Sequence, residues 1–166
     1  MATSLKQALF ANPQNFLALG AGSGLAPVAP GTFGTVAAIP LLFILPSNPW
    51  LYGAITMVMF VVGVYLCGNC ADYMQTHDHP AIVWDEWVGL LITMFLVPLS
   101  IVTVILGFAL FRFFDILKPW PIGLADKKIS GGLGIMIDDV LAGIMAAIVM
   151  HLLLLAFDLS SLTFQL

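Results

Sequence analysis

The 166-residue chain is 61% hydrophobic and 8% charged, with a mean hydropathy of +1.06 and a formal net charge of -4. An average soluble domain has roughly 25% charged residues, so this composition excludes an ordinary soluble protein and predicts an integral membrane protein. The 5 basic residues form no stripe along which nucleic-acid phosphates could bind, so membrane phospholipids are the expected partners, and nucleic acid is not.

The N-terminal part predicts two short helices joined by an irregular stretch. Residues 1–13 favour an interfacial helix that ends at Pro13. Residues 16–34 are rich in glycine and proline and predict a loop. This loop serves either to cradle an anion with its backbone N–H groups or to let helices pack closely, and both uses stay open. Residues 32–45 are apolar but short, about 21 Å as a helix against a hydrocarbon core of roughly 30 Å, and predict a partly inserted span.

A polar island at residues 72–86 follows a full-length span predicted at residues 50–71. The island is acidic and contains no lysine or arginine, and Asp85 and Glu86 stand where the next apolar run begins. The helix dipole explains one acid in a first turn, but an acidic pair in so apolar a protein requires a cation. His77, in the same island, is predicted to bind phosphate, to relay a proton or to lie in a solvated loop.

Residues 87–114 are apolar and interrupted by one proline, so they form either one kinked span or a hairpin of two short ones. Every lysine and arginine is Lys6 or lies within residues 112–128, and the positive-inside rule places both regions in the cytoplasm. A hairpin brings Asp85 and Asp115 to that face, whereas a kinked span separates them by about 30 Å. We therefore expect hairpins.

The second polar island covers residues 112–134 and is expected on the same cytoplasmic side. Arg112, Asp115 and Lys118 recur at three-residue spacing and share one helix face, either as a salt-bridged ladder or as phosphate contacts. A glycine-rich turn at residues 130–134 offers backbone N–H groups to an anion.

The last predicted span covers residues 135–157, with Asp138 and Asp139 near its start. Its length is sufficient to cross the membrane. Together these elements predict an all-α fold: residues 1–166 form one compact multi-helix integral membrane domain with short hairpin spans and one long C-terminal span.

Two acidic pairs and several cations on one membrane face indicate magnesium and phosphoryl chemistry on a lipid, since Mg²⁺ takes oxygen ligands and often joins carboxylates to phosphate. The predicted metal ligands are the two pairs, Asp85, Glu86, Asp138 and Asp139. The predicted catalytic residues, which orient or deprotonate the attacking water, are Asp115 and Asp85. The predicted substrate contacts are Arg112, Lys118, Lys128, His77 and Thr32.

Four segments also resemble a known family: GSGLAPVAPGTFG, HDHPAIVWDEWVG, FRFFDILKPWPI and GGLGIMIDDVLAG, which begin at residues 22, 77, 111 and 131. They are similar to the phosphatidylglycerophosphatase A family of bacterial inner-membrane lipid phosphatases, and the resemblance extends over residues 16–157. It implies an all-helical, magnesium-dependent hydrolase that converts phosphatidylglycerophosphate to phosphatidylglycerol and phosphate in phospholipid biosynthesis. The expected location is the bacterial cell inner membrane, with several spans and the active site facing the cytoplasm.

Two other functions compete with this one. A CDP-alcohol phosphotransferase also uses membrane-edge aspartates and a metal, but its ordered Asp-Gly…Ala-Arg…Gly…Asp…Asp signature is missing from the sequence. A non-enzymatic cation carrier or channel needs acids at several depths along a path, whereas these acids stand at the ends of predicted spans. The sequence leaves the oligomeric state open.

Overall fold

The computed structural model describes residues 4–76 and 78–157, and every regular element in these residues is helical. In chain order the elements are α1 (Leu5–Ala11), α2 (Pro13–Ala18), the 3₁₀ helix η1 (Gly20–Leu25), α3 (Pro30–Ile44), α4 (Pro49–Met74), α5 (Trp84–Thr93), α6 (Ile101–Leu117), α7 (Ile122–Lys128) and α8 (Gly131–Phe157). The predicted all-α fold is confirmed.

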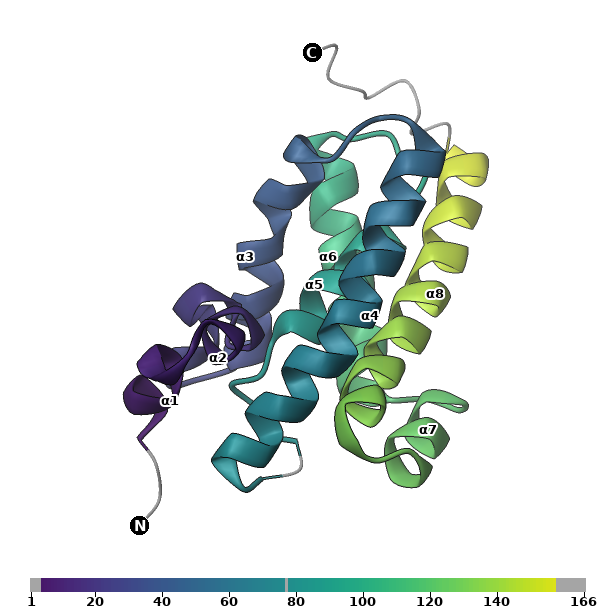
Figure 1. Ribbon diagram of the computed structural model, residues 1–166. Helices are drawn as coiled ribbons and strands as arrows, with labels where there is room; N and C mark the ends of the chain where they lie inside the picture. Colours follow the sequence, from purple (N-terminus) through teal and green to yellow (C-terminus); the bar gives the residue numbers. More distant parts are fainter. Residues whose placement is uncertain (1–3, 77, 158–166) are drawn as a thin grey trace.

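The two longest helices, α4 and α8, have 26 and 27 residues and are apolar enough to cross a membrane. At 1.5 Å per residue each is about 40 Å long, which exceeds the roughly 30 Å hydrocarbon core. They pack side by side and run in opposite directions (Figure 1). A Cβ on Gly132 would collide with the carbonyl oxygen of Val64, so a glycine is required where the two backbones meet.

Helices α5 and α6 form a hairpin and not one kinked span. α5 ends at Thr93, and α6 begins after Ser100, whose hydroxyl accepts a hydrogen bond from the Thr103 N–H at 3.1 Å. α5 also packs closely on α8: the two backbones approach so near that a Cβ added to Gly143 would lie 2.6 Å from the carbonyl oxygen of Gly89. Because α5 and α6 form a hairpin, the N-terminal end of α5 and the C-terminal end of α6 lie at the same end of the molecule (Figure 1).

The N-terminal part differs from the loop predicted at residues 16–34. Helices cover most of this stretch, and the chain departs from helical geometry at Ala21 and Gly22, whose φ angles are 54° and 100°. The prediction of a loop is therefore wrong for most of its length. The physical reason is that Pro13 and Pro30 each occupy the first position of a helix, where a missing N–H costs nothing.

The glycines of this region let helices pack closely. A Cβ on Gly24 would collide with the carbonyl oxygen of Ala81, and one on Gly34 would lie 2.5 Å from the Cβ of Val83. The Val83 N–H also donates to the carbonyl oxygen of Ala18 at 2.9 Å. These contacts hold the chain immediately before α5 and so position the start of that helix. Of the two uses predicted for the glycines, close packing is the one that these contacts support.

α8 begins earlier than predicted. It starts at Gly131, so the turn predicted at residues 130–134 is wrong, and these glycines belong to the first turn of a helix. Packing against α4 outweighs the low helix propensity of glycine here, because a larger residue does not fit at Gly132. Asp138 and Asp139 consequently lie two turns inside α8.

Within residues 4–76 and 78–157, the Asp, Glu, Lys and Arg residues lie toward one end of the helix bundle. The connections at residues 45–48 and 94–100 contain no Asp, Glu, Lys or Arg and lie at the top of Figure 1. The charge-bearing residues of the described chain lie toward the opposite end: in α1 and α7, near the C-terminal ends of α4 and α6, in the segment that joins α4 to α5, in the first turn of α5 and two turns inside α8. This charged end contains the candidate site.

Candidate active site

The first acidic pair, Asp85 and Glu86, is buried in the first turn of α5. The preceding Trp84 anchors this turn to α4, because its indole N–H donates to the carbonyl oxygen of Met59 at 3.0 Å. Its ring also stacks on Trp87, with 5.3 Å between ring centroids. The Glu86 N–H donates to Asp85 Oδ1 at 3.0 Å. Packing between α4 and α5 therefore holds the pair in place.

Glu86 belongs to a polar network that joins three helices. Its Oε2 atom pairs with Arg112 Nη1 of α6 and accepts a hydrogen bond from Thr35 Oγ1 of α3 at 2.6 Å. Arg112 Nη1 also lies 2.6 Å from Asp115 Oδ2, so the first two residues of the predicted salt-bridged ladder on α6 form an ion pair. A Cβ on Gly31 would collide with Glu86 Oε1, so α3 approaches the acid through its backbone as well.

The second acidic pair, Asp138 and Asp139, lies on α8 and is 6% and 3% exposed. Lys118, which ends α6 in a left-handed conformation with φ 42°, places its Nζ 2.7 Å from Asp138 Oδ2. Asp138 Oδ1 and Asp139 Oδ2 are buried without a hydrogen-bond partner in the part of the chain that the structure describes. Two unsatisfied buried oxygens are costly unless a cation or a donor binds them.

The two acidic pairs form one electrostatic unit. The Asp139 carboxylate lies within Coulombic range of Asp85, Glu86, Asp115 and Asp138. Burial raises the pKa of Asp85 well above its ordinary value, and the neighbouring charges of Glu86 and Asp138 raise it further. Ionising these acids together is therefore unfavourable without a counter-charge.

The donor set of this cluster fits magnesium. The candidate ligands are carboxylate oxygens, which Mg²⁺ prefers, and Asp138 and Asp139 each present one unsatisfied oxygen. In residues 4–76 and 78–157, no group of three or more His, Cys, Asp or Glu side chains forms a ready-made metal cage. Magnesium does not require one, since it usually keeps several waters and shares one or two carboxylates with a substrate phosphate.

The remaining predicted substrate contacts are Thr32, Lys128 and His77. Thr32 is half-buried in the first turn of α3, next to Gly31, which contacts the Glu86 side chain. Lys128 is exposed and ends α7, at the charged end of the molecule. His77 lies outside the described residues. Thr32 therefore lies next to a residue that contacts an acid of the cluster.

Two residues near the acids are missing from the predicted set. Thr35 is 0% exposed and hydrogen-bonded to the α5 pair, and its signal in the sequence is a second threonine one helical turn after Thr32. Asp78 acts through its charge on both Asp85 and Asp138. The sequence feature that could have indicated Asp78 is its position in the segment HDHPAIVWDEWVG, which also contains Asp85 and Glu86.

Comparison with known proteins agrees with the geometry of a charged site at one end of apolar helices. The family model described as phosphatidylglycerophosphatase A matches residues 16–154. The chain is 46% identical over 142 residues to phosphatidylglycerophosphatase A of Escherichia coli (strain K12), which covers 84% of this chain and 83% of the relative. It is 49% identical over 148 residues to phosphatidylglycerophosphatase A of Haemophilus influenzae, which covers 87% of this chain and 91% of that relative. No solved structure matches the chain. The chain therefore belongs to the phosphatidylglycerophosphatase A family and is a phosphatase.

Proposed function

We propose that the chain is a magnesium-dependent lipid phosphatase that hydrolyses phosphatidylglycerophosphate to phosphatidylglycerol and phosphate in phospholipid biosynthesis. The observation that carries this proposal is the cluster of two buried acidic pairs beside Lys118 and Arg112, in a chain with two relatives, 46% and 49% identical, that are named for this activity. Membership of an enzyme family argues against a carrier or channel, and the family is not that of the CDP-alcohol phosphotransferases.

The acids that would hold the magnesium ion are Asp138 and Asp139, with Asp85 beside them. Their support is the unsatisfied oxygen on each α8 residue and the Coulombic proximity of Asp85. When bound, Mg²⁺ would supply positive charge that offsets the charge of the phosphate and stabilises the charge of the transition state. Glu86 stays a predicted ligand, although its Oε2 atom is already engaged by Arg112 and a threonine hydroxyl.

Two cations of α6 are suited to hold the phosphate. Lys118 places its ammonium group 2.7 Å from Asp138 Oδ2, beside the acids that would hold the metal, where its positive charge would attract a phosphate oxygen. Arg112 uses Nη1 for its two carboxylates, and its buried Nε has no hydrogen-bond partner in the described part of the chain. Its guanidinium can therefore support the acids and still donate to substrate.

Asp85 and Asp115 are the candidates that orient or deprotonate the attacking water. Each lies within Coulombic range of Asp139, so each borders the place where metal and phosphate would meet. Asp115 is held by Arg112 at 2.6 Å, which fixes its orientation. A water between these carboxylates would donate hydrogen bonds to them and would thereby be aligned for attack on phosphorus.

The proposed enzyme crosses the bacterial inner membrane several times, and its active site faces the cytoplasm. Two helices are long and apolar enough to span, and the α5–α6 hairpin returns to the charged end. All 5 lysines and arginines lie at Lys6 or within residues 112–128, on elements that meet at this end. The positive-inside rule supports a cytoplasmic location for it.

The test is phosphate release from phosphatidylglycerophosphate by the purified protein in detergent. Release should require Mg²⁺, stop with EDTA and return when Mg²⁺ is added in excess. Full activity in EDTA would contradict the magnesium requirement, and no release under any condition would contradict the substrate. Release of CMP from a CDP-lipid, or magnesium flux into proteoliposomes without phosphate release, would favour one of the alternative functions.

A further inference from the structure

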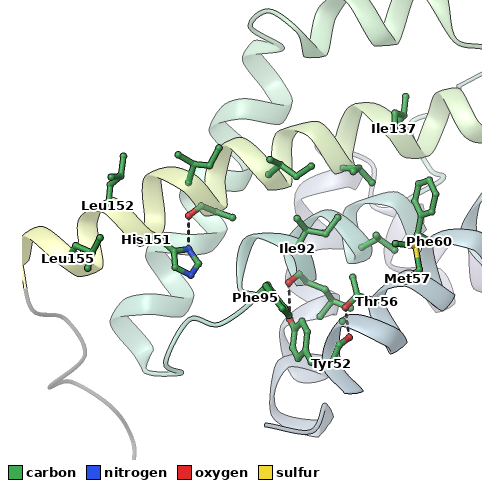
Figure 2. A pocket seen from close by; sticks show the side chains of 17 residues that line it. Tyr52, Thr56, Met57, Phe60, Ile92, Phe95, Ile137, His151, Leu152 and Leu155 are labelled. Atoms are coloured by element: carbon green, nitrogen blue, oxygen red, sulfur yellow. Dashed lines mark hydrogen bonds between the residues drawn. The ribbon is translucent and has the colours of Figure 1, made fainter. Parts of the chain in front are cut away.

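An apolar groove of about 850 Å³ lies between α4 and α8, and α5 forms its third wall. Figure 2 shows that it follows α8 from Ile137 at one end to Leu155 at the other, with Phe60 and Tyr52 of α4 on the facing side. The volume falls within the roughly 300–1,000 Å³ typical of small-molecule sites. The groove plays no part in the chemistry proposed for the acids.

One end of the groove adjoins the acidic cluster. Ile137 and Val140 line the groove and flank Asp138 and Asp139 in the sequence. Successive helix residues point about 100° apart, so one turn of α8 presents carboxylates to the site and apolar side chains to the groove. α5 likewise contributes acids to the site and apolar residues to the groove. A molecule with a phosphate and a long apolar tail can therefore occupy both at once.

The polar side chains that line the groove bind the protein's own backbone. The Tyr52 hydroxyl donates to the carbonyl oxygen of Leu91 at 2.9 Å, and the Thr56 hydroxyl donates to that of Tyr52 at 3.0 Å. His151 Nδ1 lies 2.8 Å from the carbonyl oxygen of Ala147. These groups do not call for a polar ligand. A hydrocarbon chain is the occupant whose chemistry matches this lining.

We propose that the groove binds one acyl chain of the phosphorylated lipid whose head group occupies the acidic cluster. This inference rests on the proposed function for the identity of the head group. From Ile137 to Leu155 α8 rises about 27 Å, more than the roughly 15 Å of one leaflet of the hydrocarbon core, so an acyl chain fits along it. The bound chain fixes the position of the phosphate by van der Waals contact along its length.

A protein helix fits the same groove less well than an acyl chain. A helix is about 10–12 Å wide with its side chains, so one seated between α4 and α8 would also cover Ile137 and Val140, where the groove adjoins the acids. A lipid substrate that enters from the groove would then be blocked. An acyl chain leaves the approach open, because it enters together with its head group.

The test replaces Ala147, which lines the groove, with tryptophan, and compares phosphatidylglycerophosphate carrying dioleoyl chains with the same head group carrying dihexanoyl chains. The new indole fills the groove, so the ratio of kcat/KM for the long-chain to the short-chain substrate should fall at least about tenfold, mainly through KM. The matched control is Ala54→Trp, which adds the same side chain at an exposed position of α4 outside the groove. Its ratio should equal that of the wild-type protein.

An unchanged ratio in Ala147→Trp would overturn the proposal. An equal loss on both substrates with an altered oligomeric state would also overturn it, because the groove would then be a contact between copies. If Ala147→Trp does not fold, the smaller Ala147→Phe and photo-crosslinking of a diazirine-bearing acyl chain to the wild-type protein replace it. Crosslinks should map to the groove residues of α4 and α8, and crosslinks confined to other surfaces would contradict the proposal. Wild-type protein that crosslinks in the groove but releases no phosphate from phosphatidylglycerophosphate would contradict the proposed function alone.

Discussion

The acidic pairs of α5 and α8 consist of similar residues but have different partners. On α5, Glu86 Oε2 is engaged by the guanidinium of Arg112 and the hydroxyl of Thr35. On α8, Lys118 contacts one oxygen of Asp138, and Asp139 Oδ2 has no hydrogen-bond partner within the described chain. The protein thus pairs Glu86 with its own cation and leaves one oxygen each of Asp138 and Asp139 to be neutralised by something else.

This difference divides the site into an architectural part and a reactive part. The network around Glu86 joins α3, α5 and α6, so breaking it should loosen the fold, because a buried carboxylate would lose its partner. The unsatisfied oxygens of Asp138 and Asp139 already cost stability, so replacing these acids should affect chemistry more than folding. Changes at Glu86 should therefore lower mainly stability, whereas changes at Asp138 or Asp139 should lower mainly activity.

The largest effect is expected for Asp139→Asn. We expect turnover to fall about 1,000-fold, equivalent to roughly 4 kcal/mol of transition-state stabilisation, because a carboxylate that faces metal and phosphate is lost. The thermal unfolding midpoint should stay the same or rise, since the amide removes a buried charge that lacks a partner. Phosphate release measured across a magnesium titration, together with thermal unfolding in the same detergent, checks both expectations.

The matched control for this variant is Asp72→Asn, at an exposed position near the end of α4. It changes the same group outside the cluster and should keep wild-type turnover. Wild-type turnover in Asp139→Asn would remove this acid from the reactive part. A loss of activity that accompanied unfolding would show that the α8 pair supports the fold, and the division between the two pairs would then be wrong.

A smaller effect, on the stability of the fold, is expected for Arg112→Met. The free energy of unfolding should fall by about 3 kcal/mol, because the buried Glu86 and the half-buried Asp115 lose their shared cation. Unfolding by SDS in mixed micelles measures this change. The double variant Arg112→Met, Glu86→Gln should recover part of the stability, since the carboxylate left unpaired is then neutral. If Arg112→Met lost activity but kept its stability, Arg112 would serve only to bind substrate and would not support the fold.

Local rules were sufficient to predict the all-helical class, the α5–α6 hairpin and the end of the molecule at which the acids meet. A proline interrupts the apolar run, and the side-chain hydroxyl of Ser100 caps the helix that follows, so the α5–α6 hairpin could be expected from these features and from the positions of the charges. The first-turn position of Asp85 and Glu86 in α5 followed in the same way. These features depend on neighbours in the sequence.

The features that could not be predicted depend on contacts between distant segments. Gly132 is helical because α4 approaches within contact of its backbone, although glycine is a poor helix former. The bond from Thr35 to Glu86 joins residues 51 positions apart, and no periodic pattern says which hydroxyl meets which acid. Likewise, the sequence predicted both acidic pairs as equal metal ligands, because only the packed helices show that Arg112 lies against one of them.

The smallest effect is expected for Thr35→Val, which removes one hydroxyl and nearly preserves the shape of the side chain. The free energy of unfolding should fall by about 1 kcal/mol, since Glu86 keeps Arg112 but loses a hydrogen bond. Turnover should fall by less than about tenfold, because the hydroxyl acts on the site only through Glu86. Thr35→Ser, which retains the hydroxyl, should restore both values toward wild type.

The matched control for this last variant is Thr93→Val. Thr93 is also buried, but its hydroxyl donates to the carbonyl oxygen of Gly89 in its own helix at 2.9 Å, away from any acid. It should cost similar stability without changing the magnesium dependence of phosphate release. A shifted magnesium dependence in Thr35→Val alone would show that Glu86 shares in holding the ion, as the sequence predicts. An identical magnesium dependence in both variants would place Glu86 wholly in the architectural part, and the reactive carboxylates would then be Asp138 and Asp139 with Asp85 beside them.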